Sequence, residues 1–245
     1  MELGYSSLAL IGLIVFLAYV VVGTTGFGAS ITSVPLLVHL LPLTTVVPMM
    51  VVFDLCAGLL LGGRNFKAIN RGELLRLLPF MLAGIALGVT LLVSAPERIL
   101  LLTLGVSVLC YAAWSLFGRQ PTAAIDTRWS IPLGAVGGVF SALFGTGGPI
   151  YTIYLARRIG DKRELRATIS TLIFISALAR FIALVAAGIF AQRPLLLLTA
   201  LMLPCMLLGL FAGNRLHHRL PAKQVVRVIW SLLLVSSSSL IWRSL

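Results

Sequence analysis

Two glycine-rich stretches could bring backbone hydrogen-bond donors to a ligand. They read Gly145-Thr146-Gly147-Gly148-Pro149 and Gly26-Phe27-Gly28-Ala29-Ser30, and both interrupt apolar sequence. Inside a bilayer, a non-helical stretch is tolerated only where protein buries it or where it lines a wet cavity. A helix that restarts after such a break directs unpaired N–H groups and the positive end of its dipole into that cavity. The two stretches therefore predict an anion site.

Two charged residues lie inside apolar sequence that should form membrane helices. Asp54 is near the middle of the predicted helix 43–61, and Arg180 is near the middle of 167–189. Placing an ionisable side chain in the hydrocarbon costs at least ~2.5–3.5 kcal/mol, so such residues are functional candidates. We expect Arg180 to hold an anion, and Asp54 either to balance that arginine or to carry a coupling proton. The alternative is a structural pair that closes the helix bundle, and the sequence favours neither.

Other glycines have a simpler explanation. Gly84 with Gly88, and Gly209 with Gly213, form the small-xxx-small pattern that lets two membrane helices pack closely. The same packing could explain the two glycine-rich stretches, but a Gly-Thr-Gly-Gly-Pro cluster fits a helix break better. These glycine faces could serve a homo-oligomer as easily as internal packing.

The composition requires a membrane environment. Of the 245 residues, 59% are hydrophobic and 11% are charged, and apolar runs recur from Leu8 to Ile241. A bilayer accommodates such a chain as helices of roughly 20 residues each. We therefore expect an all-α polytopic protein of the cytoplasmic membrane, built as one integral domain. The first apolar run, Leu8–Val22, is expected to be retained rather than cleaved as a signal peptide.

The formal net charge of +12 is concentrated in short loops. Most of the 19 Lys and Arg residues lie in 64–76, 119–128, 157–166 and 215–227, between apolar runs. This is the positive-inside pattern, which places those loops in the cytoplasm. A nucleic-acid interface would need a continuous basic face, so we expect no nucleic-acid partner.

The second half of the sequence repeats the first. Pro79-x4-Gly84-x3-Gly88 recurs 125 residues later as Pro204-x4-Gly209-x3-Gly213, and the glycine-rich stretches align at an offset of 119. Basic loops of one half correspond to nearly neutral loops of the other, so the halves have opposite orientation, as in many secondary transporters. We predict two inverted repeats, 1–120 and 129–245, joined by a cytoplasmic linker at 121–128, with both termini outside.

Each repeat is predicted to contain a glycine-broken helical hairpin and three spanning helices. Trp129 and Arg157 are both expected on the cytoplasmic side, yet the residues between them are too few for two spans of roughly 20 residues each. This segment should enter the membrane, break at Gly145–Pro149 and leave by the same face. In an inverted-repeat transporter, two such breaks meet near the midplane, around the substrate.

These features resemble the TauE/SafE family of sulfite and sulfonate exporters, also called the toluene sulfonate uptake permease family. The resemblance extends from about Gly4 to Trp242, and rests on a glycine-rich break followed by an apolar helix in each half and on the basic central loop. It implies a permease for a small sulfur oxyanion or organosulfonate, coupled to protons. It also implies substrate-binding residues in both breaks: Thr24, Thr25, Gly26, Gly28, Gly145, Thr146, Gly147 and Gly148.

Other functional classes fit less well. An integral-membrane enzyme would need a catalytic constellation, but the chain has seven acidic residues in all and no HExxH or Asp-rich motif. No cofactor and no metal site are indicated. An anion channel would share the donors and the repeat, and a carrier for carboxylates or other small solutes would share the architecture, so both remain alternatives.

Overall fold

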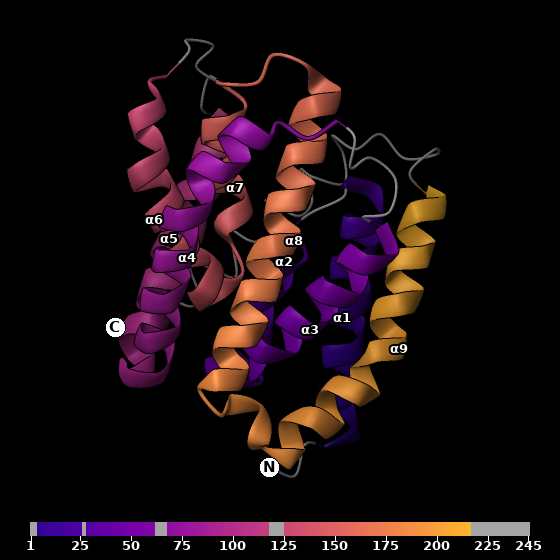
Figure 1. Ribbon diagram of the computed structural model, residues 1–245. Helices are drawn as coiled ribbons and strands as arrows, with labels where there is room; N and C mark the ends of the chain where they lie inside the picture. The colour runs from indigo at the N-terminus through magenta and orange to yellow at the C-terminus, as the bar shows by residue number, and fades with distance from the viewer. Residues whose placement is uncertain (1–3, 26–27, 62–67, 118–124, 217–245) are drawn as a thin grey trace. The chain divides into compact units, whose positions relative to one another are not determined.

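The computed structural model describes residues 4–25, 28–61, 68–117 and 125–216. Within these ranges every regular element is a helix, which confirms the all-α prediction. Figure 1 labels the α-helices along the chain. In order, the elements are α1 (Tyr5–Thr25), α2 (Ala29–Leu37), α3 (Leu43–Leu61), α4 (Arg71–Ser94), α5 (Glu97–Phe117), η3 (Thr127–Trp129), α6 (Ser130–Phe144), α7 (Gly147–Leu155), α8 (Lys162–Ala186), η4 (Ile189–Ala191) and α9 (Arg193–Leu216).

Five of the described helices are long and apolar enough to cross a membrane, namely α1, α3, α4, α8 and α9. Because a hydrocarbon core requires about 20 helical residues, these helices support the prediction of a polytopic membrane protein. The last apolar run, which the sequence predicts as a further spanning helix, falls in 217–245, outside the described residues. Residues 121–124, the first half of the predicted linker at 121–128, are also outside them.

Helix α8 begins at Lys162, before the predicted range 167–189, and α4 likewise begins before its apolar run. Both α4 and α8 include polar residues before their apolar run, because a capping side chain precedes each of them. The amide oxygen of Asn70 accepts the N–H of Glu73 at 3.0 Å, and the carboxylate of Asp161 accepts the N–H of Glu164 at 2.7 Å. Such caps satisfy amides that the first turn leaves unpaired, so the helix extends back to the cap.

The helices form two compact units, and each unit draws on both halves of the sequence. The first contains Met1–Met49, Ala95–Arg119 and Gln192–Leu245, and the second contains Met50–Ser94 and Gln120–Ala191. Helix α3 crosses the boundary between Met49 and Met50. The boundaries of these units therefore differ from those of the two predicted repeats.

The first unit is organised around the pairing of α1 with α9, and Figure 1 shows α9, in orange to yellow, alongside α1, in indigo. A Cβ atom added at Gly209 would collide with the carbonyl oxygen of Phe16, so the two backbones can approach this closely only at a glycine. Gly213 makes the same contact with Val20, one turn further along both helices. Helix α2 packs against α1.

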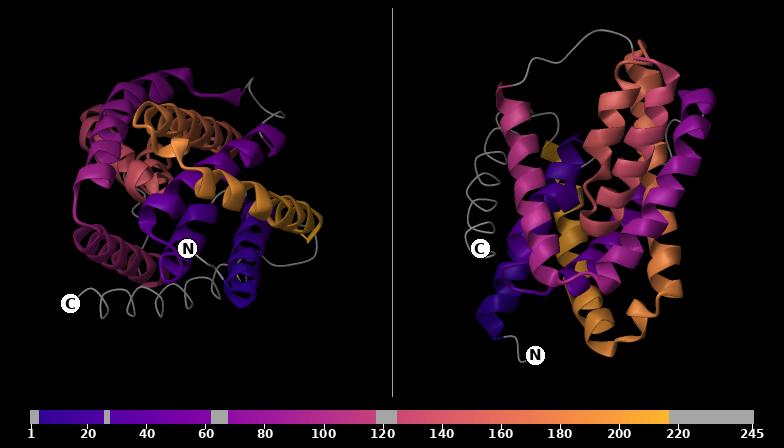
Figure 2. Two further views of the ribbon diagram at one scale, coloured as in Figure 1. Left: turned by 90° about the horizontal axis from the view of Figure 1, so that it is seen from below. Right: turned by 90° about the vertical axis from the view of Figure 1, so that its left-hand side faces the viewer.

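The second unit is organised around the pairing of α4 with α6, which lie side by side (Figure 2). Here a Cβ atom at Gly84 would collide with the carbonyl oxygen of Ala135, and one at Gly88 would lie 2.8 Å from that of Val139. Helix α8 contacts α4, α6 and α7. The close approaches confirm the packing role predicted for the paired glycines of α4 and α9.

Candidate functional site

The second glycine-rich stretch separates two short helices of the second unit. Helix α6 has 15 residues and α7 has 9, and both fall short of the roughly 20 that a full span requires. Between them, Gly145 adopts a left-handed conformation with φ 71° and ψ 11°, which residues with a side chain rarely adopt. The amide of Gly145 donates to the carbonyl oxygen of Ser141 at 2.8 Å. The last turn of α6 therefore satisfies part of the polar backbone at the break.

The other residues of this stretch lie close to neighbouring helices. Thr146 is buried, and its side chain makes no capping hydrogen bond with α7. Gly147 packs closely against α6. A Cβ atom added at Gly147 would lie 2.5 Å from the carbonyl oxygen of Gly137. Gly148 faces Ile173 of α8 in the same way, at 3.3 Å. A ligand at this break would therefore meet the Thr146 hydroxyl and the backbone, because neighbouring helices cover the glycine faces.

Arg180 joins the break to Asp54. Its Nη1 donates to the carbonyl oxygen of Ser141 at 2.9 Å, and its Nη2 lies 3.2 Å from Oδ2 of Asp54. Only 2% of Arg180 is exposed. The Ser141 carbonyl belongs to the last turn of α6, where the helix dipole favours a positive charge. The two charged residues singled out in the sequence therefore form an ion pair, and one carbonyl oxygen links that pair to Gly145.

Three further polar residues lie beside Arg180, and the sequence did not single them out. The hydroxyls of Ser141 and Ser176 are 2.6 Å apart, and the Tyr151 hydroxyl lies near both of them and near the charge of Arg180. All three residues are buried. The Tyr151 hydroxyl and Nε of Arg180 have no hydrogen-bond partner among the described residues. One signal was available, since Ser176 precedes Arg180 by four residues and therefore shares its helix face.

The first glycine-rich stretch belongs to the other unit, and its boundary differs from the predicted one. The sequence predicts Thr24 and Thr25 in the break, but α1 continues through Thr25. The Thr24 hydroxyl donates to the carbonyl oxygen of Val21 within α1 at 2.8 Å, an arrangement that is compatible with a continuous helix. Gly28 is left-handed, with φ 99° and ψ 10°, directly before α2. Gly26 lies outside the described residues.

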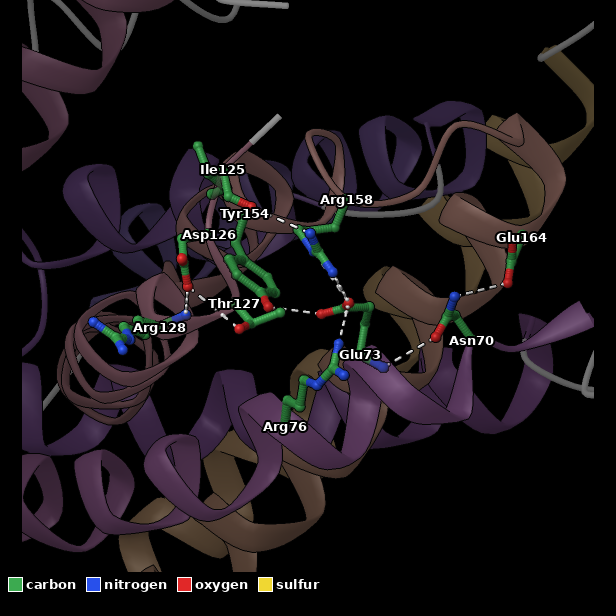
Figure 3. A network of polar contacts seen from close by, with 10 residues as sticks. All are labelled: Asn70, Glu73, Arg76, Ile125, Asp126, Thr127, Arg128, Tyr154, Arg158 and Glu164. Carbon is green, nitrogen blue, oxygen red and sulfur yellow. Dashed lines mark hydrogen bonds and ion pairs between the residues drawn. The ribbon is translucent and has the colours of Figure 1, made fainter. Parts of the chain in front are cut away.

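A second polar cluster joins α4 to the end of α7 (Figure 3). The buried carboxylate of Glu73 accepts hydrogen bonds from the Tyr154 hydroxyl at 2.6 Å and from Nη2 of Arg158 at 2.9 Å. Arg76 donates to the same carboxylate at 2.7 Å, and Arg158 also reaches the carbonyl oxygen of Ile125 at 3.3 Å. The hydrogen bond to Glu73 raises the pKa of Arg158, so this arginine stays charged.

The same cluster extends to α8 through Asn70. Its amide nitrogen Nδ2 donates to Glu164 at 2.9 Å, and its backbone N–H donates to the Thr168 hydroxyl at 2.9 Å (Figure 3 shows the first of these bonds). Helix α7 itself is held at both ends, because Gly147 packs against α6 at its start and Tyr154 donates to Glu73 of α4 near its end. Within the described ranges, no group of three or more His, Cys, Asp or Glu side chains could hold a metal ion.

Comparison with known proteins decides the family. A family profile described as sulfite exporter TauE/SafE matches residues 11–240, which is nearly the whole chain. The chain belongs to the TauE/SafE family. This confirms the resemblance carried by the glycine-rich stretches, and membership of an exporter family identifies the chain as a membrane transporter.

A relative supports the same assignment. The TauE/SafE chain is 28% identical over 201 residues to a protein of Comamonas testosteroni that is named probable inner membrane transporter protein TsaS. The match covers 80% of this chain and 83% of the relative. No solved structure matches the chain significantly.

Proposed function

We propose that this TauE/SafE protein is a secondary transporter that moves a small sulfur oxyanion, such as sulfite or an organosulfonate, across the inner membrane. The family description names sulfite, and the Comamonas relative is named as an inner membrane transporter, which supports the substrate class and the location. The observation that carries the proposal is Arg180, buried beside a helix break and held there by Ser141 and Asp54. A desolvated guanidinium is well suited to bind an oxyanion, because its N–H groups match the geometry of paired oxygens.

The helix break would supply further donors to the same substrate. Helix α7 begins at Gly147, so the positive end of its dipole and its unpaired amides lie at the break. In this proposal the substrate oxygens meet Arg180, the Thr146 hydroxyl and the backbone N–H groups of Gly147 and Gly148, because the amides of Gly145 and Thr146 already donate to α6. A contribution from Thr24, Thr25, Gly26 and Gly28 of the first break stays a prediction of the sequence.

Asp54 is proposed to carry the coupling proton. A substrate anion that binds Arg180 competes with the Asp54 carboxylate for the same positive charge. A carboxylate that loses its counter-charge in a low-dielectric environment binds a proton more readily. Anion and proton would then cross together, and release of the anion would restore the ion pair. The Nη2–Oδ2 distance of 3.2 Å is longer than the distances in the Glu73 ion pairs, 2.7 and 2.9 Å, which supports an exchangeable partnership.

We also propose that the transporter is built from two inverted repeats. The contact of Gly84 with Ala135 in one unit and the contact of Gly209 with Phe16 in the other are related by offsets of 125 and 119 residues. These are the offsets that align the two halves of the sequence, so the matching contacts support homologous halves. The distribution of basic loops supports opposite orientations, with both termini outside and the linker at 121–128 in the cytoplasm.

The test is transport by purified protein in liposomes with an imposed pH gradient. We expect saturable uptake of labelled sulfite that depends on the gradient, competes with benzenesulfonate and is lost in Arg180→Gln. Arg193→Gln is the matched control, because Arg193 is exposed at the start of α9 and should leave the flux unchanged.

Two results would contradict the proposal. Flux that ignores the pH gradient and greatly exceeds carrier turnover would identify an anion channel. A folded protein that moves no sulfur oxyanion would redirect the search to carboxylates and other small solutes.

A further inference from the structure

Two buried donors near Arg180 have no acceptor in the described part of the chain. They are the Nε–H of Arg180, whose residue is 2% exposed, and the hydroxyl of Tyr151, whose residue is 0% exposed. Leaving a buried donor unpaired costs more free energy than an average hydrogen bond gains, so native proteins rarely keep two of them together. A ligand with acceptor oxygens would satisfy both.

Other contacts fix the direction of each donor. Nη1 and Nη2 of Arg180 already donate to Ser141 and Asp54, whereas Nε donates to no described residue, so the Nε edge is the part of the guanidinium most available to a ligand. The Tyr151 ring is packed so closely against α6 that a Cβ atom at Gly137 would collide with it. Neither side chain can reorient without moving its neighbours, so both donors are preorganised.

The serine pair adds a third donor. Ser141 and Ser176 share one hydrogen bond at 2.6 Å, in which one hydroxyl donates and the other accepts. The accepting hydroxyl keeps its own hydrogen, which is available to another acceptor. This hydrogen lies in the same cluster, because the Tyr151 hydroxyl is near both serines.

We infer that the Tyr151 hydroxyl, the Nε–H of Arg180 and one hydroxyl of the Ser141–Ser176 pair bind the oxygens of the transported head group. The inference rests on the proposed function and adds the residues that determine specificity. Three donors match a sulfonate or sulfite, which carries three oxygens on one sulfur, better than they match a carboxylate with two. The Arg180–Asp54 pair has no net charge, so an anion that binds here is balanced when Asp54 takes up a proton.

Transport kinetics of Tyr151→Phe and Ser176→Ala test the assignment, with benzenesulfonate and benzoate as a matched pair of substrates that differ only in the head group. Loss of a hydrogen bond to a charged group should raise the KM of Tyr151→Phe for benzenesulfonate about 10- to 100-fold. Ser176→Ala should reduce the preference for benzenesulfonate over benzoate about tenfold.

Thermal unfolding without ligand is the second readout. Tyr151→Phe should leave the Tm unchanged or raise it, because the substitution removes an unpaired buried hydroxyl and keeps the ring. Tyr154→Phe is the matched control from the same helix. Its hydroxyl donates to Glu73, so this variant should lower the Tm and leave the KM for benzenesulfonate unchanged.

The outcomes separate the inference from the proposed function. If wild-type protein transports benzenesulfonate and Tyr151→Phe does so with the same KM, the inference is overturned. A lower Tm of Tyr151→Phe with unchanged KM would show that the hydroxyl bonds a structural water, and would also overturn it. A wild-type protein that benzenesulfonate stabilises against unfolding, but does not cross, would contradict the proposed function and preserve the site. If benzenesulfonate neither binds nor crosses, both fail.

Discussion

Arg180 of α8 and Asp54 of α3 form an ion pair, although 126 residues separate them in the sequence. Only 3% of the Arg180 side chain and 16% of the Asp54 side chain are exposed. Removing one partner of such a pair leaves an uncompensated buried charge, whereas removing both does not. The stability of single and double variants therefore reports how strongly the two charges depend on each other.

We predict that Arg180→Gln and Asp54→Asn each lower the free energy of unfolding by about 3–5 kcal/mol, and that the double variant recovers most of this loss. Denaturant unfolding in detergent measures all three. The double variant should be folded and unable to transport sulfite, which separates the loss of the binding site from the loss of the fold. Single variants as stable as the wild type would show that the pair contributes nothing to folding.

Asp54→Asn should uncouple transport from the pH gradient. Without the competing carboxylate, Arg180 remains available to the anion, so sulfite exchange between the two sides should persist with an unchanged or lower KM. Net uptake driven by the gradient should disappear, because asparagine does not take up a proton. Asp126→Asn is the control, since this side chain is remote in sequence and caps an exposed turn that asparagine can also cap. Gradient-driven uptake by Asp54→Asn would rule out this residue as the proton carrier.

Hydropathy and charge predicted the features that the membrane itself imposes. The all-α fold and the choice of Asp54 and Arg180 as candidate residues follow from the cost of polar groups in hydrocarbon, which any sequence must respect. Ser141, Tyr151 and Ser176 could not be predicted in the same way. Serine and tyrosine are ordinary residues of membrane helices, and only the packing of α6, α7 and α8 brings these three together.

One local prediction was wrong and one buried cluster carried no prediction, for a common reason. The pair Thr24-Thr25 resembles the start of a break, but a threonine hydroxyl can bond back within its own helix, and Thr24 does so. Glu73 resembles an ordinary first-turn acid, but it is buried under Tyr154 and Arg158 from another part of the chain. In both cases the partner of the polar group decides its role, and the sequence alone does not identify that partner.

The charged residues of the Glu73 cluster should differ in how much each contributes to stability. Glu73→Gln removes the negative charge with which both Arg158 and Arg76 pair, and should lower the free energy of unfolding by about 1.5–3 kcal/mol. Arg158→Gln should cost less, and Arg76→Gln should change stability by under about 1 kcal/mol, because half of its side chain is exposed. Thermal unfolding of the three variants ranks them. Equal effects would show that exposure does not govern the contribution of these charges.

Alanine at either packing glycine should destabilise the protein. A Cβ atom at Gly84 or Gly209 meets a backbone carbonyl of the facing helix, so the helices must separate, which costs about 1–3 kcal/mol. Gly160→Ala is the control, because an added Cβ there meets nothing within 4 Å and the backbone is not left-handed. A Gly84→Ala protein that unfolds at the wild-type temperature would show that α4 and α6 can adjust without cost.

Gly145 and Gly188 allow the backbone strain at the break to be separated from its role in transport. Both glycines have a left-handed backbone, with φ of 71° and 74°. An added Cβ atom at Gly188 would meet nothing within 4 Å. Alanine at either position should therefore lower stability by a similar amount, about 1–2 kcal/mol. Only Gly145→Ala should also impair sulfite transport, because the amide of Gly145 and the guanidinium of Arg180 share the carbonyl oxygen of Ser141. Unfolding and sulfite transport are measured on both variants. Equal loss of transport in the two would mean that flux follows overall stability and that the backbone geometry at Gly145 has no specific role in transport.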